Sequence, residues 1–355
     1  MKVRAFITHK LCEQYADCQD RFCINEDSRT IAVSDGMSQS IFPDYWADIL
    51  ATQYANEGHC NEEDRIRLCS SWLQRVEEYR DEQVRLGKNP WKLNNFLSAH
   101  KGAGATICGV SFENATNWKG DVLGDSCIVE VELEKNIVKI LSSEEKAFDY
   151  YPDYYDSFPE KKGRGIIKSF SGTIDPNKIL LLVSDPFSEF LDKNKADCEE
   201  LIRQILQLNN HSDFCNLVDR WREKGMHNDD STLCLIEFDD SLDFNIRYQD
   251  SIADLITEEK TKEEETIAPI IQDEPHVLSN EVEVNNEEVS VLLQYHKKVE
   301  ALLNELLEKY RVKNQSQKKR GLGKKGKQKK STIYPEIKSI IDNLSKYYNL
   351  LISKK

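Results

Sequence analysis

The sequence has no long apolar run. None of its 355 residues falls in a stretch that approaches the roughly 18 apolar residues of a membrane-spanning helix. The opening MKVRAFITHKLCEQ also lacks the apolar core of a signal peptide. We therefore expect a cytoplasmic protein without membrane contact. CxxC spacing is absent among the ten cysteines, which argues against a Cys/His zinc site and predicts reduced thiols.

Positive charge is in deficit overall but is concentrated in one segment. The net charge of −14 argues against a nucleic-acid binder as a whole. Residues 318–330, KKRGLGKKGKQKK, contain no acidic residue, whereas residues 257–265 are mostly acidic. A salt-sensitive contact between the basic loop and nucleic acid is one hypothesis. A solvated loop is the simpler interpretation, because no aromatic residue lies between the lysines to stack on bases.

Short apolar runs and longer amphipathic stretches alternate up to about residue 240. Turn residues separate candidate strands at 2–8, 31–34, 105–112, 118–123, 127–133, 137–141, 179–184 and 232–238. Apolar spacing of three and four predicts helices at 45–56, 61–86, 90–100, 196–207 and 212–224. This order lacks regular βαβ repetition. It predicts an α+β fold, a β-sandwich of antiparallel sheets with helices packed outside.

The composition changes after residue 255, so we expect a first domain over 1–255. Residues 256–287 have too little apolar surface to form a core and are predicted to be an acidic flexible linker. Apolar residues then recur at heptad spacing on both sides of a basic loop at 313–331. Residues 288–355 are therefore predicted to form a helical hairpin or a dimeric coiled coil, with a partner-binding or self-association role.

Aspartates stand at the ends of several candidate strands. Asp20 and Asp35 lie at the two ends of one candidate hairpin, Asp185 follows ILLLVS, and Asp229 precedes TLCLIEF. Taken singly, an aspartate at such a place is usually a turn former or a helix cap. Several that converge would repel one another unless a cation offset their charge. Such a set suits Mg²⁺ or Mn²⁺, and Gly36 allows a backbone carbonyl to approach the ion.

Six motifs occur in one order over about residues 1–240. They are CQDRF (18–22), AVSDGMSQS (32–40), GAGATICGVSF (102–112), GDVLGDSCIVEVE (120–132), ILLLVSD (179–185) and NDDSTLCLIEF (228–238). In this order they resemble the type 2C (PPM) family of metal-dependent serine/threonine protein phosphatases. The opening from His9 to Asp20 is more similar to its divergent bacterial branch. The resemblance implies a type 2C-like β-sandwich flanked by helices.

The resemblance also implies a metal centre and a reaction. Its ligands would be Asp20, Asp35, the Gly36 carbonyl, Asp185 and Asp229, with Asp125 for a third, weaker ion. Asp35 would bridge two Mn²⁺ or Mg²⁺ ions, Asp185 and Asp229 would complete the first site, and Asp20 with Gly36 would support the second. A metal-activated water would then hydrolyse phosphoserine or phosphothreonine in a protein substrate without a covalent phosphoenzyme.

Two departures from the family pattern lie close to these ligands. Ser38 and Gln39 stand where the family has two glycines, and Pro186 follows Asp185 in place of glycine. Proline fixes its own φ and removes an amide donor, so we expect altered backbone geometry beside Asp185.

The arginine that holds the substrate phosphate in many relatives has no clear match here. Counting back from Asp20 reaches Tyr15. Six basic residues near the motifs or in the predicted flap at 148–172 are substitutes for that arginine, namely His9, Lys10, Arg21, Lys161, Lys162 and Arg164.

Two hypotheses follow. The first is an active protein phosphatase, a signalling hydrolase of phosphoric monoesters whose C-terminal region recruits a substrate or partner. The alternative is a catalytically weak pseudophosphatase that acts as a partner-binding module through the same region. Retention of all five predicted aspartate ligands favours the first.

Overall fold

The computed structural model describes residues 1–143 and 152–267. The predicted heptad helices, the basic loop at 313–331, most of the predicted linker and the first residues of the predicted flap lie outside these residues. Within the described part, none of the helices has the length and apolar character needed to cross a membrane.

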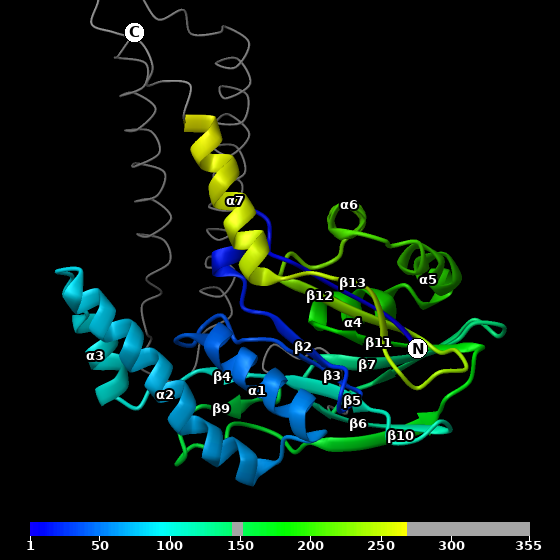
Figure 1. The fold of residues 1–355 in the computed structure, drawn as a ribbon, viewed down its shortest axis with the longest axis horizontal. Helices are drawn as coiled ribbons and strands as arrows, with labels where there is room; N and C mark the ends of the chain where they lie inside the picture. The colour runs from blue at the N-terminus through cyan, green and yellow to red at the C-terminus, as the bar shows by residue number, and fades with distance from the viewer. Residues whose placement is uncertain (144–151, 268–355) are drawn as a thin grey trace, which may run out of the picture. The chain divides into compact units, whose positions relative to one another are not determined.

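Two β-sheets form the centre of the fold (Figure 1). The six-stranded sheet has the order β13 (Asn245–Gln249), β1 (Lys2–Thr8), β12 (Ser231–Glu237), β11 (Lys178–Val183), β7 (Cys127–Glu132) and β8 (Ile137–Leu141). The five-stranded sheet has the order β10 (Lys168–Thr173), β6 (Asn117–Leu123), β5 (Ile107–Ser111), β3 (Thr30–Ser34) and β2 (Arg21–Asn25). A short pair joins β4 (Gly104–Ala105) to β9 (Tyr155–Asp156). Named strand pairs are antiparallel except β1 with β13, which are parallel.

Helices cover the outer faces of both sheets. The described helices are α1 (Pro43–Glu57), α2 (Glu62–Arg85), α3 (Trp91–Ser98), α4 (Asp185–Lys193), α5 (Cys198–Leu206), α6 (His211–Glu223) and α7 (Ile252–Ile267), with short 3₁₀ turns at Tyr15–Asp17 (η1) and Lys195–Asp197 (η2). Helices α4, α5 and α6 share a core with the six-stranded sheet, and α1 and α2 share one with the five-stranded sheet (Figure 1).

A third core fills the space between the sheets, and β11 shows how the sequence builds it. Leu180 and Leu182 face the inter-sheet core, while Leu181 and Val183 face the helices. Because both faces of this strand are covered, it is apolar throughout rather than alternating. The predicted β-sandwich flanked by helices is confirmed.

Several elements were not predicted from the sequence, among them β2, β9, β10, β13, α4 and α7, and the predicted linker begins inside α7. Strands β10 and β13 alternate exposed and partly buried residues, so they lack a strong apolar run. Strand β2 is only partly buried, and α4 begins at an Asp-Pro pair that reads as a turn. Residues 256–267 were predicted to begin the flexible linker, but they belong to α7. The first turn of this helix packs against the domain through Leu255, which contacts Ile7 and Cys18.

Candidate metal centre

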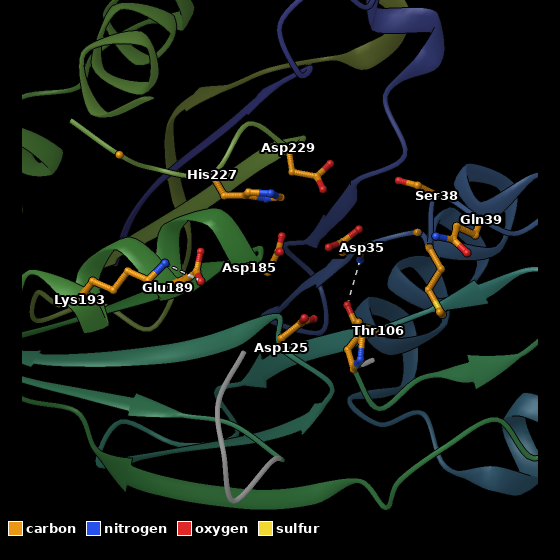
Figure 2. Close-up of a pocket in the computed structure, with 14 residues that line it drawn as sticks. Asp35, Ser38, Gln39, Thr106, Asp125, Asp185, Glu189, Lys193, His227 and Asp229 are labelled. Carbon is orange, nitrogen blue, oxygen red and sulfur yellow. Dashed lines mark hydrogen bonds and ion pairs between the residues drawn. The ribbon is translucent and has the colours of Figure 1, made fainter. Parts of the chain in front are cut away.

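The predicted ligands meet at one end of the sandwich. Asp35 follows β3, Asp185 begins α4 directly after β11, Asp229 precedes β12, and Asp125 lies in the turn between β6 and β7. Together with Gly36 they line one cavity of about 590 Å³. Figure 2 shows the carboxyl groups of Asp35, Asp185 and Asp229 directed toward the same space, with Asp125 across from them.

Asp20 is buried next to Asp35 and is not among the described residues that line this cavity. Strands β2 and β3 pair Arg21 with Ser34, so Asp20 and Asp35, at the two chain ends of this hairpin as predicted, lie beside each other at its open end. Asp20 is 0% exposed. Its Oδ2 accepts a hydrogen bond of 2.8 Å from the Thr232 hydroxyl, but its Oδ1 has no hydrogen-bond partner among the described residues.

The local environment disfavours negative charge on these carboxyls. Burial, followed by the charge of Asp230, raises the pKa of Asp20 to about 7. Burial and the neighbouring aspartates raise the pKa values of Asp35 and Asp185 well above the ordinary range. Desolvation and like-charge repulsion both favour the protonated acid. Nearby positive charge would therefore stabilise the ionised cluster.

The donor set fits a hard divalent cation. The Asp185 Oδ1 is buried and, like the Asp20 Oδ1, has no hydrogen-bond partner among the described residues. Such oxygens are costly to leave unpaired and are the ligands that Mg²⁺ and Mn²⁺ prefer. The residues present therefore fit the predicted metal.

Two backbone features hold Asp35 and Gly36 in place. The Asp35 amide donates to Thr106 Oγ1 at 3.2 Å, and the Thr106 amide donates to the Asp35 carbonyl at 2.9 Å. A Cβ on Gly36 would lie 2.8 Å from the Pro43 Cβ and 2.9 Å from the Gln19 carbonyl oxygen. Glycine is therefore required at position 36 by packing alone.

Of the three predicted phosphate contacts near the amino terminus, Lys10 reaches the cluster. Its Nζ lies 2.8 Å from Asp229 Oδ1 and donates to Ser38 Oγ at 3.1 Å. Arg21 instead bonds the carbonyls of Cys18 and Asp20 and pairs with Asp44 at 3.2 Å.

His9 does not join the cluster. Its Nδ1 lies 2.8 Å from the Lys10 carbonyl oxygen, and its ring packs edge-on against Tyr15. The side chain of Tyr15, at the position of the family arginine, points to Thr8 and His211.

The basic residues of the predicted flap are placed away from the cavity lining. Lys161 donates to the His100 carbonyl, Arg164 lies 3.6 Å from Asp153, and Lys162 is exposed. None of the three is among the residues that line the described cavity.

Three ionisable residues that line the cavity, His227, Glu189 and Lys193, were not predicted from the sequence. Ligand atoms of His227, Asp185 and Asp229 all lie within 4.8 Å of one another. Glu189 and Lys193 follow Asp185 by four and eight residues on α4 and line the same cavity. Their helical spacing was a usable signal, but only once α4 itself was known. His227 carries only the weak signal of lying two residues before Asp229.

Pro186 has an ordinary place in this structure. It lies in the first turn of α4, immediately after Asp185. Backbone amides there have no intrahelical acceptor, and the fixed φ of proline suits a helix start. The proline that departs from the family pattern therefore starts a helix whose first residue is a predicted metal ligand.

No family model and no curated protein matches this sequence. Solved structures do match. A bacterial serine phosphatase has a TM-score of 0.45 at 12% identity, over 67% of this chain and 97% of its own. The serine/threonine phosphatase Stp1 from Staphylococcus aureus has a TM-score of 0.45 at 14% identity, and the match covers 67% of this chain and 94% of Stp1. The S. agalactiae serine/threonine phosphatase has a TM-score of 0.41 at 13% identity, and the match covers 67% of this chain and 100% of the S. agalactiae chain.

All three neighbours are named as serine or serine/threonine phosphatases, and the six sequence motifs resemble a family of serine/threonine phosphatases. At these identities and TM-scores they decide nothing about activity. The acidic cluster itself must support any functional assignment.

Proposed function

We propose that this chain is a divalent-cation-dependent protein phosphatase that hydrolyses phosphoserine and phosphothreonine. The observation that carries the proposal is the convergence of Asp35, Asp185 and Asp229 on one cavity, with Asp20 buried beside Asp35. The raised pKa values of Asp20, Asp35 and Asp185 support a cationic occupant. The ordered sequence motifs support the same class independently.

The ligands we propose for two Mg²⁺ or Mn²⁺ ions are Asp20, Asp35, the Gly36 carbonyl, Asp185 and Asp229, with Asp125 for a third, weaker ion. His227 is an added donor beside Asp185 and Asp229. Such ions, when bound, lower the pKa of a coordinated water and neutralise phosphoryl oxygens.

Lys10 is the residue we assign to the substrate phosphate. Burial would lower the pKa of its ammonium, but the hydrogen bond and charge of Asp229 outweigh burial and raise that pKa, so Lys10 stays cationic. Ser38 and Asp229 hold the ammonium at the cavity. A fixed cation at this place would orient a phosphate monoester, which is the role of the missing arginine. His9, Arg21, Lys161, Lys162 and Arg164 are less suited, because each lies elsewhere or is engaged in other contacts.

One observation favours the pseudophosphatase alternative. The ion pair between Lys10 and Asp229 already neutralises one proposed ligand with a cation from the chain itself. A site in which that pair persisted would hold a metal weakly and turn over slowly.

Hydrolysis of p-nitrophenyl phosphate and of a phosphothreonine peptide tests the proposal. Each substrate is assayed with Mn²⁺, Mg²⁺ or EDTA, for the wild type, Asp35→Asn and the matched control Asp81→Asn, whose side chain is 63% exposed on α2. We expect cation-dependent turnover that Asp35→Asn abolishes and Asp81→Asn retains. Turnover that persists in EDTA or in Asp35→Asn would refute the metal assignment. Calorimetric cation binding without turnover would favour the alternative.

Region 288–355 is proposed to bind a partner or a second copy of the chain, and nucleic-acid contact through 318–330 remains the less favoured hypothesis. Cytoplasmic location and a phosphorylated protein substrate complete the proposal. A chain ending at residue 271, the end of the first compact unit, separates catalysis from these roles.

A further inference from the structure

A second cluster of reactive side chains lies apart from the cavity. His211 and Cys215 are one turn apart on α6, and Asp250 follows β13. His211 Nδ1 lies 2.9 Å from Asp250 Oδ2, and His211 Nε2 lies 3.2 Å from Cys215 Sγ and 2.6 Å from the Tyr15 hydroxyl. The imidazole therefore lies between a carboxylate and a thiol. None of these three residues lines the cavity described above.

Asp250 is held rigidly. Its side chain is 1% exposed. Its Oδ2 accepts from the Ile7 amide at 2.9 Å, and its Oδ1 accepts from the Tyr248 hydroxyl at 2.9 Å. With both oxygens engaged, the carboxylate fixes the ring of His211 and directs Nε2 toward the sulfur, which is the role of the third member of a nucleophile–base–carboxylate set.

The surroundings of the sulfur favour a thiolate. Burial would lower the pKa of His211, but hydrogen bonds to Asp250 and Cys215 outweigh it and raise that pKa to about 10. Burial would raise the pKa of Cys215, yet the hydrogen bond and charge of His211 outweigh it and lower that pKa below its ordinary value. The Cys215 thiol donates to Thr8 Oγ1 at 3.6 Å, and the Tyr15 hydroxyl lies 3.8 Å from the sulfur.

We propose that Cys215 is a site of oxidation by hydroperoxides to the sulfenic acid, with His211 as the proton donor and Asp250 as the positioning residue. The thiolate sulfur attacks one peroxide oxygen, the O–O bond breaks, and the imidazolium gives its proton to the leaving hydroxide. With hydrogen peroxide the products are Cys215 sulfenic acid, water and neutral His211. The sulfur loses two electrons and the peroxide gains them.

The other cysteines provide internal controls. Burial raises the pKa values of Cys18, Cys60, Cys108 and Cys234, so these thiols stay protonated. Cys12 is exposed but, within the described residues, makes no hydrogen bond to a histidine. Cys215 is partly exposed, so peroxide can reach a thiolate there. Oxidation should therefore select Cys215 over the more accessible Cys12.

The test uses the full chain treated with limiting hydrogen peroxide at pH 7, with dimedone to trap sulfenic acid and mass spectrometry to map it. We expect Cys215 to be labelled at least about tenfold faster than Cys12, because an ordinary thiol is only a few per cent thiolate at this pH. His211→Gln should reduce the rate at Cys215 to that of Cys12. Equal rates in the wild type, or an unchanged rate in a folded His211→Gln, would overturn the proposal.

A measurement on the wild type alone keeps the proposal falsifiable if the variant does not fold. The rate at which iodoacetamide alkylates Cys215 is followed from pH 5 to pH 9. If the alkylation rate of Cys215 levels off at a lower pH than the rate of Cys12, the thiol pKa of Cys215 is depressed, as proposed. A rate at Cys215 that climbs in parallel with that of Cys12 up to pH 9 contradicts it.

Discussion

Buried negative charge is compensated differently in two parts of the molecule. One is the acidic cluster of Asp20, Asp35, Asp185 and Asp229, and the other is the Cys215 cluster of His211, Cys215 and Asp250. In the second, the Asp250 oxygens are engaged by the Ile7 amide, the Tyr248 hydroxyl and His211, so the negative charge is compensated within the chain. In the first, buried oxygens of Asp20 and Asp185 have no hydrogen-bond partner among the described residues. The polar groups around a buried aspartate, rather than its burial, therefore decide whether its charge is compensated within the chain.

The largest expected effect comes from replacing a carboxylate of the acidic cluster. Asp185→Asn removes a charge that the fold disfavours, so the metal-free protein should unfold at an equal or higher temperature than the wild type. Activity should fall at least about 100-fold, because several kcal/mol of transition-state stabilisation are lost. Calorimetry in EDTA and an assay in Mn²⁺ check the two halves. A variant that is both less stable and fully active would contradict the account.

An aspartate-to-asparagine substitution in the Cys215 cluster should have the opposite effects, a loss of stability with little change in activity. Asp250→Asn leaves His211 and the Ile7 amide without their charged partner, which should reduce the free energy of unfolding by about 2–3 kcal/mol. Phosphatase activity per folded molecule should stay within about twofold, because Asp250 does not line the cavity. Urea unfolding and an activity assay on the folded fraction measure both. Unchanged stability would show that this network contributes little.

The pH dependence of the metal-free protein follows from Asp20. Its pKa of about 7 in the folded state exceeds the ordinary value of 3.8, so between these pH values the folded protein holds a proton that the unfolded chain releases. Stability in EDTA should therefore fall as the pH rises from 5 to 7, by about 2 kcal/mol. Asp35 and Asp185 shift in the same direction and add to the fall.

Urea midpoints at pH 5, 6 and 7 test this dependence. Asp20→Asn should flatten the curve, and Asp81→Asn should leave it unchanged. A metal-free wild type that becomes more stable toward pH 7 would show that the cluster is not self-repelling.

A smaller effect is expected at Lys10, the cation that the chain itself supplies to the acidic cluster. Lys10→Met should raise KM for a phosphopeptide about five- to tenfold, because one charge-assisted hydrogen bond is lost. The same change frees Asp229 and should tighten Mn²⁺ binding. Lys119→Met, at a side chain that is 63% exposed, is the matched control. If KM and Mn²⁺ affinity both stay constant, Lys10 has no part in the site.

Removal of the residues after 271 should have the smallest effect on catalysis. Turnover of p-nitrophenyl phosphate should stay within about twofold, because every described residue that lines the cavity belongs to the first compact unit. Activity on a protein substrate should change if 288–355 recruits it. Loss of both activities would contradict a separable C-terminal region.

The main strands and the positions of the aspartates could be predicted because their signals are local. An apolar run that ends in aspartate, such as ILLLVSD, shows both a buried strand and a polar side chain at its end. The weakly patterned edge strands β10 and β13 had no such signal, and α4 was hidden by its Asp-Pro start.

Contacts that depend on tertiary structure were beyond sequence reasoning. Lys10 and Asp229 are 219 residues apart, and the sequence offered Lys10 only as one of six basic candidates. His211 and Cys215 have helical spacing, but their third partner, Asp250, lies 39 residues from His211 on another element. Only the pairing of β13 with β1 brings Asp250 to the Ile7 amide and to α6.

The most direct test of the central claim is the thermal unfolding of EDTA-stripped protein titrated with Mn²⁺, for the wild type, Asp35→Asn and Asp81→Asn. A cation bound only by the folded state at 100 times its Kd stabilises by about 2.7 kcal/mol, or roughly 5–10 °C in Tm for a domain of this size. We predict that rise for the wild type and for Asp81→Asn, and almost none for Asp35→Asn. An equal rise in all three, or none in the wild type, would show that the acidic cluster is not a metal centre.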